Sequence, residues 1–301
     1  MADFVDIMDV APRDGLQNDP VDLSTEDKLE LIARLVAAGL KHVEVTSFVN
    51  PKRVPRMADA DELSRRLPKL PGVSYVGLLM NERGMERALA AGIAEINAVT
   101  VASDAFAARN QNMTSEQSVD LAIAILEAAR AAGVKASVGI ATAFGCPFEG
   151  EVPVERVAAI AKRLAEAGYP EIALADTIGV ATPGDVIERF GALAAAAPGV
   201  KMRGHFHNTR NTGIANAWAA VSVGVRGLDA SLGGIGGCPF APKATGNIPT
   251  DDLAYMLARS GYETGIDLPK LVEASTWLGE RLGRQLPAML GRAGIFPKLA
   301  A

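Results

Sequence analysis

The stretch Leu35-Val36-Ala37-Ala38-Gly39-Leu40-Lys41-His42-Val43-Glu44-Val45-Thr46 joins a helix-like segment to a short apolar run through one glycine. Glycine readily takes the left-handed conformation that ends a helix, and short β-branched runs after such a turn are typical of strands. The same arrangement occurs seven times along the chain, after Gly39, Gly72, Gly92, Gly133, Gly168, Gly199 and Gly224.

Eight strands are predicted in total once the opening segment is added. They are Val5 to Val10, Val43 to Thr46, Val73 to Leu78, Glu95 to Val101, Val134 to Ile140, Glu171 to Ala175, Lys201 to His207 and Arg226 to Ser231. The intervals between them leave room for a crossover helix after each strand. An open doubly wound sheet would show the same alternation, so the count of eight favours a closed (β/α)8 TIM barrel of the α/β class.

The chain is expected to form a single domain over residues 1–301, with the barrel at about 4–232, a glycine-rich cysteine loop at 233–247 and C-terminal helices within 250–301. Helix start signals lie at Ser24 or Thr25, at Thr114 with Gln117, and at Thr182. Two further helices are expected at Thr250 to Arg259 and Leu268 to Leu282, and we expect them to cover one end of the barrel.

The composition limits the classes of function. Of 301 residues, 49% are hydrophobic and the net charge is only −5, which is too mild to indicate a nucleic-acid or membrane-surface partner. No apolar run approaches the roughly 20 residues of a membrane span, and Met1 to Asp9 lacks the pattern of a signal peptide, so the cytoplasm is expected. Two cysteines are too few for a disulfide scaffold or a four-cysteine zinc site.

Polar residues gather where the predicted strands end. In a TIM barrel these ends meet at one mouth, where the catalytic groups lie. The residues concerned are Arg13, Asp14, Glu44 to Ser47, Asn81, Asp176, Thr177, His205 and His207.

The most specific local feature is His205-Phe206-His207, which holds two of the three histidines in the chain. Residues two apart on a strand face the same side, so both imidazoles could bind one cation; the alternative is two core histidines bonded to backbone carbonyls. Asp14 is the candidate anionic ligand, and the mixed ligands suggest Mg²⁺ or Mn²⁺, with Zn²⁺ or Co²⁺ as alternatives. Arg13 would hold an enolate oxygen or a carboxylate, unless Arg13 and Asp14 form only an exposed ion pair.

The loop Gly233-Gly234-Ile235-Gly236-Gly237-Cys238-Pro239 places four glycines before a thiol. Its spacing matches neither the dinucleotide fingerprint nor the P-loop. Cys238 is either a proton donor above the mouth or an inert buried thiol. Cys146, in the loop after the fifth strand, has a structural or a functional role.

Taken together, the motifs resemble the hydroxymethylglutaryl-CoA lyase family, within the metallolyase superfamily that includes isopropylmalate and homocitrate synthases. The motifs are residues 9–18 (DVAPRDGLQN), 46–48 (TSF), 176–179 (DTIG), His205-x-His207, and 234–239 (GIGGCP) leading to Gly246-Asn247. The resemblance implies that Asp14, His205, His207 and Asn247 bind the divalent metal, that Arg13 polarises the substrate carbonyl and that Cys238 transfers a proton.

The implied reaction is a retro-Claisen cleavage of 3-hydroxy-3-methylglutaryl-CoA to acetyl-CoA and acetoacetate, as in leucine catabolism and ketone-body formation, by a homo-oligomer. Glu44 and Asp176 match acidic family positions and would orient groups or carry protons, or else form only structural hydrogen bonds. Gln17 and Arg210 are candidate substrate-binding residues.

Three departures from the family pattern concern the acyl group. Asp9 replaces the usual glutamate, and within Asn208-Thr209-Arg210-Asn211 the residues Asn208 and Arg210 replace the aspartate and the tyrosine of the family's Asp-Thr-Tyr-Gly. Arg210 would bind a carboxylate or a CoA phosphate, or else be a solvated side chain. The alternatives are therefore the same lyase chemistry on citramalyl-CoA or a longer 3-hydroxy-3-alkylglutaryl-CoA, a Claisen condensation of acetyl-CoA with a 2-oxo acid, and a non-catalytic barrel that binds an acyl-CoA.

Overall fold

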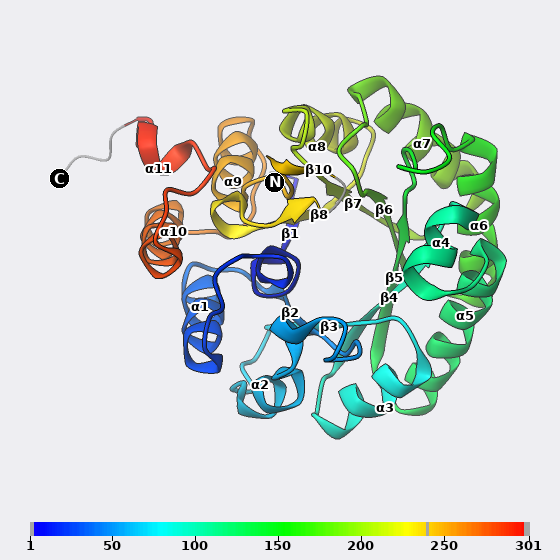
Figure 1. Cartoon of the computed structure of the whole chain (residues 1–301). Coiled ribbons are helices and arrows are strands. Elements are labelled where there is room, and N and C mark those ends of the chain that lie inside the picture. The colour runs from blue at the N-terminus through cyan, green and yellow to red at the C-terminus, as the bar shows by residue number, and fades with distance from the viewer. Residues whose placement is uncertain (1–2, 239–240, 298–301) are drawn as a thin grey trace.

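Eight parallel strands form a closed barrel in chain order, with β1 paired to β8, which confirms the predicted TIM barrel (Figure 1). The structure is a computed structural model that describes residues 3–238 and 241–297, with the side chains of 238 and 241–245 outside the description. The strands are β1 Asp6–Asp9, β2 His42–Ser47, β3 Ser74–Leu79, β4 Glu95–Val101, β5 Lys135–Ala141, β6 Glu171–Asp176, β7 Lys201–Phe206 and β8 Gly227–Ala230. Each overlaps its predicted segment.

Helices surround the barrel and begin where the capping signals predict. The Ser24 hydroxyl accepts a hydrogen bond from the Asp27 amide, and Thr114 and Thr182 each form a capping box. The α-helices between the strands are α1 Thr25–Ala37, α2 Ala60–Arg66, α3 Glu82–Ala90, α4 Asp104–Gln111, α5 Ser115–Ala131, α6 Val154–Ala167, α7 Pro183–Ala196 and α8 Gly213–Ser222, with short helical turns η1 Ala11–Gly15 and η2 Pro55–Met57.

The barrel has an apolar outside and a largely polar inside. The main core lies between the strands and the helices, whereas Met8, Val10 and Val76 form a separate small cluster. Arg203 on β7 contacts side chains from β4, β5, β6 and β8, and strands so far apart around the ring can meet only in its interior. Since alternate residues share a face, His205 points to the same interior, one layer nearer the mouth.

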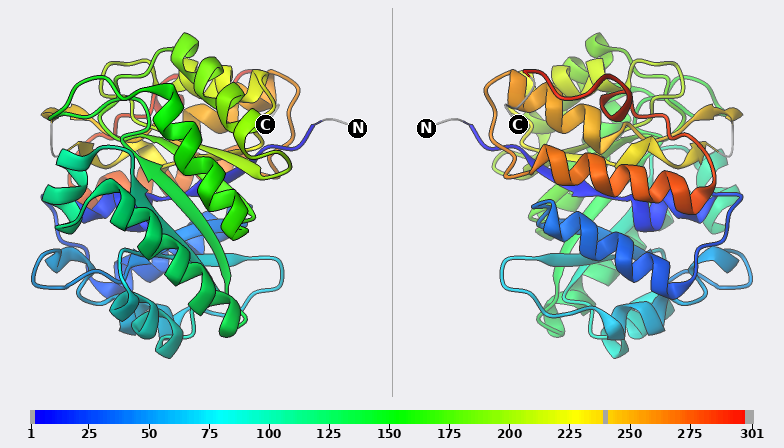
Figure 2. Two further views of the ribbon diagram at one scale, coloured as in Figure 1. Left: turned by 90° about the vertical axis from the view of Figure 1, so that its right-hand side faces the viewer. Right: turned by 90° about the vertical axis from the view of Figure 1, so that its left-hand side faces the viewer.

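Two C-terminal helices form where predicted, α9 Thr250–Arg259 and α10 Leu268–Leu282, but the expectation that they cover one end of the barrel is wrong. They close the outer ring of helices between α8 and α1, and α10 lies beside α1 (Figure 2). The apolar face of α10, with Leu271 and Leu278 fully buried, is covered there. A final short helix, α11 Leu290–Ala293, follows.

The glycine-rich segment returns to the strand ends at the mouth. It contains the turn η3 Leu232–Gly234 and the hairpin of β9 Gly237–Cys238 with β10 Ala241–Thr245. Beyond the hairpin, Asn247 forms a bridge to His207 and Pro249 forms one to Ser231. Among the described residues, no helix combines the length and hydropathy that a membrane crossing requires.

Candidate metal and catalytic site

Asp14, His205 and His207 converge at the mouth, where β1 and β7 end. The Nε2 atoms of the two histidines lie 3.2 Å apart, and Asp14 Oδ2 lies 3.9 Å from His205 Nε2 and 3.7 Å from His207 Nε2. The side chains are 18%, 13% and 8% exposed in the order Asp14, His205, His207, so the cluster is shielded but can be reached from the mouth.

These three residues fit a divalent cation. Ligand atoms about 2.2 Å from one ion lie about 3.1 Å apart when they are at right angles and about 4.4 Å apart when opposite, and the observed separations fall in this interval. The ligand atoms come from two imidazoles and one carboxylate, a mixed set that suits Mg²⁺, Mn²⁺ or Zn²⁺. Within the described part of the chain, no other cluster of three such residues has this spacing.

His205 is oriented by a carboxylate behind it. Its Nδ1 lies 3.2 Å from Asp229 Oδ2 on β8, so the Nδ1 proton is donated to Asp229 and the Nε2 lone pair faces Asp14. Burial, the largest single effect, lowers the pKa of His205, but Asp229 and then Asp14 outweigh it and the net pKa is raised. For Asp14 burial opposes ionisation, yet Arg13 and the two histidines hold its pKa well below the usual value. Asp14 is therefore a carboxylate at neutral pH.

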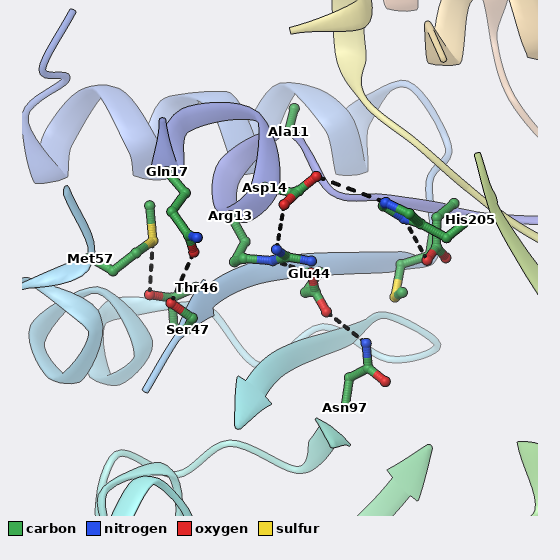
Figure 3. A network of polar contacts seen from close by, with 12 residues as sticks. Ala11, Arg13, Asp14, Gln17, Glu44, Thr46, Ser47, Met57, Asn97 and His205 are labelled. Atoms are coloured by element: carbon green, nitrogen blue, oxygen red, sulfur yellow. Dashed lines mark hydrogen bonds and ion pairs between the residues drawn. The ribbon is translucent and has the colours of Figure 1, made fainter. Parts of the chain in front are cut away.

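Arg13 lies between two carboxylates (Figure 3). Its Nη1 donates to Asp14 Oδ1 at 2.5 Å, and its Nε donates to Glu44 Oε2. Glu44 is fully buried and also accepts a hydrogen bond from Asn97 Nδ2 at 3.0 Å. The remaining nitrogen, Nη2, makes no hydrogen bond to any described residue. Arg13 is thus held rigidly by two of its nitrogens, and the third is available to a ligand.

Asn247 lies against the same cluster. Its Nδ2 donates to Asp14 Oδ2 at 2.9 Å, and an amide can present its oxygen to the same point by turning over. Gly236, at φ +108, allows this approach, because a Cβ there would lie 2.6 Å from Asn247 Nδ2.

Two other predicted residues bind backbone groups of one loop. Both carboxylate oxygens of Asp176 accept amide hydrogen bonds, from Val180 at 2.9 Å and Ala181 at 3.1 Å, and burial raises its pKa. Arg210 Nη1 donates to the carbonyls of Ile178 and Gly179, both at 2.9 Å. The two side chains therefore fix the loop after β6.

The remaining mouth residues vary in their contacts. Asn81 is the N-cap of α3, because its side chain accepts from the Gly84 amide. Gln17 Oε1 accepts from the Ser47 hydroxyl at 3.4 Å, between the loops after β1 and β2. Only part of the polar set at the mouth belongs to the metal cluster.

The structure describes the side chain of Cys146 but not that of Cys238. The Cys238 side chain lies outside the described part, so its predicted role stays a prediction. Cys146 is buried, and its Sγ accepts from the Ser103 hydroxyl at 2.8 Å and from the Phe148 amide at 3.4 Å. These contacts favour the structural role for Cys146.

The sequence did not predict three residues of the site network: Asn97, Arg203 and Asp229. Arg203 Nη1 donates to both oxygens of Asp229, at 2.7 and 2.8 Å. For Arg203 and Asp229 the available signal was a charged residue within a predicted strand, whereas the neutral Asn97 gave no such signal.

A cavity of about 750 Å³, large enough for part of a substrate, adjoins the site at Asn247. The rest of its lining comes from the segment after β7 and from the residues that follow α10, and includes Asn208, Arg210, Gln285, Met289 and Arg292.

Known proteins resemble this chain in sequence and in fold. A family model described as HMGL-like matches residues 4–278. The chain is 45% identical to the (R)-citramalyl-CoA lyase of Chloroflexus aurantiacus, over 99% of this chain and 97% of that protein, and 42% identical to the hydroxymethylglutaryl-CoA lyase of Pseudomonas mevalonii, over 97% and 96%. A solved HMG-CoA lyase from Acinetobacter baumannii, in complex with coenzyme A and 3-methylmalate, superimposes with a TM-score of 0.93 at 38% identity, covering 99% of this chain and 97% of that one.

Proposed function

The chain belongs to the HMGL-like family, and we propose that it is a divalent-metal-dependent lyase that cleaves 3-hydroxy-3-methylglutaryl-CoA to acetyl-CoA and acetoacetate. The observation that carries the proposal is the convergence of Asp14, His205 and His207 beside Arg13 at the barrel mouth. Relatives named hydroxymethylglutaryl-CoA lyase, which match nearly the whole chain, support the substrate.

Asp14, His205, His207 and Asn247 would hold the metal, which we propose to be Mg²⁺ or Mn²⁺. The ion would act as a Lewis acid that lowers the pKa of the substrate hydroxyl. Asp14 supplies the negative charge of the set, and Asp229 keeps the Nε2 lone pair of His205 available.

Arg13 would stabilise the charge that develops on the thioester. When the bond between C2 and C3 breaks, the 3-hydroxyl loses its proton to become a ketone, and the bonding electrons move onto the thioester as an enolate. Nη2 of Arg13 is the available donor for the enolate oxygen, while Glu44 and Asp14 fix the guanidinium in place. Gln17, on the loop that follows Arg13, would contact the substrate from the same side.

Two groups would move the protons. Asp176 would accept the hydroxyl proton, because its raised pKa makes it a stronger base than an ordinary carboxylate. Cys238 would protonate C2 of the enolate to complete acetyl-CoA. Cys238→Ala is expected to lower turnover by roughly 10² to 10⁴-fold while metal binding is kept.

Citramalyl-CoA is the second candidate substrate, favoured by the 45% identity to an (R)-citramalyl-CoA lyase. This thioester differs from hydroxymethylglutaryl-CoA by one methylene between the carbinol carbon and the carboxylate. Arg210 is already bonded to the loop after β6. It therefore fixes the conformation of that loop and does not by itself favour the carboxylate of either substrate.

A product assay separates the two substrates. Purified enzyme with Mg²⁺ is incubated with each thioester, and acetoacetate and pyruvate are measured, with Asp14→Ala as the blank. Acetoacetate formed faster from hydroxymethylglutaryl-CoA supports the proposal. Faster pyruvate formation from citramalyl-CoA would replace it with the second candidate, and no cleavage of either would refute both.

We also propose that the enzyme acts in the cytoplasm as a homo-oligomer. Fractionation of cells and light scattering of the purified protein would test these two expectations.

A further inference from the structure

Arg203 lies inside the barrel, two residues before His205 on β7, with a side chain that is only 4% exposed. Four side chains surround its guanidinium. Nε donates to Glu171 Oε1 at 2.8 Å, Nη1 donates to both oxygens of Asp229, and Nη2 lies 3.3 Å from both Asn97 Oδ1 and Ser137 Oγ. Among the described residues, none of the proposed metal ligands bonds Arg203 directly.

One branch from Arg203 leads to the proposed metal ligand. Asp229 takes both hydrogen bonds from Nη1, and its Oδ2 also accepts the Nδ1 proton of His205 at 3.2 Å. Arg203 thus holds the Asp229 carboxylate in place, and Asp229 in turn orients the imidazole of His205.

A second branch leads to the other side of the site. Nη2 of Arg203 contacts Asn97 Oδ1, Asn97 Nδ2 donates to Glu44 Oε1 at 3.0 Å, and Glu44 binds Nε of Arg13. These two contacts fix the orientation of the Asn97 amide, because its oxygen accepts from Arg203 and its nitrogen donates to Glu44.

Stability alone does not explain this arrangement. TIM-barrel interiors are filled mainly by branched apolar residues, and a buried ion pair often adds no stability over apolar residues of similar volume. A charged network inside the barrel therefore calls for a role that apolar side chains could not fill.

We propose that Arg203 is a positioning residue for the active site, which holds His205 through Asp229 and Arg13 through Asn97 and Glu44. The inference rests on the proposed function, since it takes His205 as a metal ligand and Arg13 as a substrate contact. Lysine could not replace it, because one ammonium cannot reach both branches in the planar fork geometry of a guanidinium.

The first branch is tested by Mn²⁺ binding to the full-length protein, followed by electron paramagnetic resonance, in wild type, Arg203→Lys and Asp229→Asn. Loss of an outer partner of a ligand histidine typically weakens metal binding 10 to 100-fold, and that loss is expected for both variants. The control for this branch is Ser137→Ala, which removes 3.3 Å contacts to Nη2 of Arg203 and to Asn97 Oδ1 but leaves both hydrogen bonds from Nη1 to Asp229 in place, and its Mn²⁺ affinity should stay within about twofold of wild type.

The second branch is tested by Asn97→Ala at saturating metal. Asn97 bonds Glu44, which holds Arg13, and it touches none of the proposed metal ligands among the described residues. Its loss should therefore lower kcat at least tenfold and leave Mn²⁺ affinity within about twofold.

The inference is overturned if Arg203→Lys or Asp229→Asn, folded by circular dichroism, binds Mn²⁺ as wild type does, or if Asn97→Ala changes kcat no more than Thr100→Val, a buried change on the same strand β4 that removes a hydroxyl bonded to Ser118. Should Arg203→Lys not fold, Asp229→Asn carries the first test alone. If wild type itself binds no Mn²⁺, the proposed metal function fails instead, which separates the two results.

Discussion

Two polar clusters lie one layer apart along the same barrel strands, and they are built differently. Around Arg203 every guanidinium nitrogen has a protein partner, and two of these partners are carboxylates. Around His205 and His207 the groups that face one another are two imidazole nitrogens and one carboxylate oxygen, all suited to share a cation. The inner cluster is complete within the chain, whereas the outer one is arranged for a ligand.

The inner cluster therefore orients other side chains, whereas the outer cluster is built to bind a cation. Removing one partner of a buried ion pair is strongly destabilising, because the other charge stays buried and unpaired. Ligand atoms held close together gain most of their favourable energy when a cation binds. Mutation of the outer cluster should therefore mainly reduce metal binding and activity, whereas mutation of the inner cluster should reduce stability as well.

The largest effect is expected from breaking the outer cluster. His207→Ala removes one of the four proposed metal ligands, so kcat should fall by roughly 10⁴-fold, equivalent to about 5 kcal/mol, with little change in thermal stability. Turnover of the thioester and Mn²⁺ binding measure this directly. Retention of full activity in metal-depleted buffer would contradict the proposed site.

Breaking the inner cluster should also cost stability, in addition to its effect on the site. Arg203→Met leaves Asp229 and Glu171 without their buried cation, which typically costs about 3 to 5 kcal/mol. Urea unfolding of the variant and of His207→Ala would compare the two clusters on one scale. Equal stability losses in both variants would remove the distinction drawn between them.

Asp9 and Asp229 show how the partners of a buried carboxyl group set its pKa. Asp9 is buried with only neutral hydrogen-bond donors. Its oxygens accept from the Ala11 amide and the Thr250 hydroxyl, and burial raises its pKa to about 7, whereas Arg203 keeps the pKa of Asp229 low against the same burial. Asp9 stays protonated in the folded state while the unfolded chain ionises near 3.8, so stability should fall as pH rises from about 4 to about 7 and then level off.

The stability of the Asp9→Asn variant relative to wild type should therefore increase as the pH rises. Between pH 5 and pH 8 the difference in unfolding free energy should shift by about 2 to 3 kcal/mol in favour of the variant. Urea titrations at both values measure it. The exposed Asp22→Asn serves as control and should leave the pH profile unchanged, and an unchanged profile in Asp9→Asn would disprove the assignment.

The smallest effect is expected at Asn81, a mouth residue outside both clusters. Asn81→Ala removes the N-cap of α3 and should cost about 1 kcal/mol of stability, with Mn²⁺ affinity unaltered. A large loss of metal affinity in this variant would place Asn81 in the site after all.

The sequence predicted the eight strands, the capped helices and the pairing of His205 with His207 on one strand face, because glycine stops, β-branched runs and alternation are local signals. It also predicted that Asp14 and Arg13 lie at the same mouth, since the carboxyl ends of barrel strands always meet. It left open whether Asp176 forms structural hydrogen bonds and did not predict that Arg210 bonds the same loop, because the conformation of the loop after β6 has no local sequence signal comparable to a helix cap.

What the sequence alone determined is therefore the barrel and the list of polar residues at its mouth. Only the tertiary structure decided which of them face one another, that α9 and α10 complete the outer ring, and that Arg203 joins Asp229 to Asn97. The physical reason is that closing the barrel brings β4, β7 and β8 together across its interior, and contacts between such distant segments depend on the register of the whole ring.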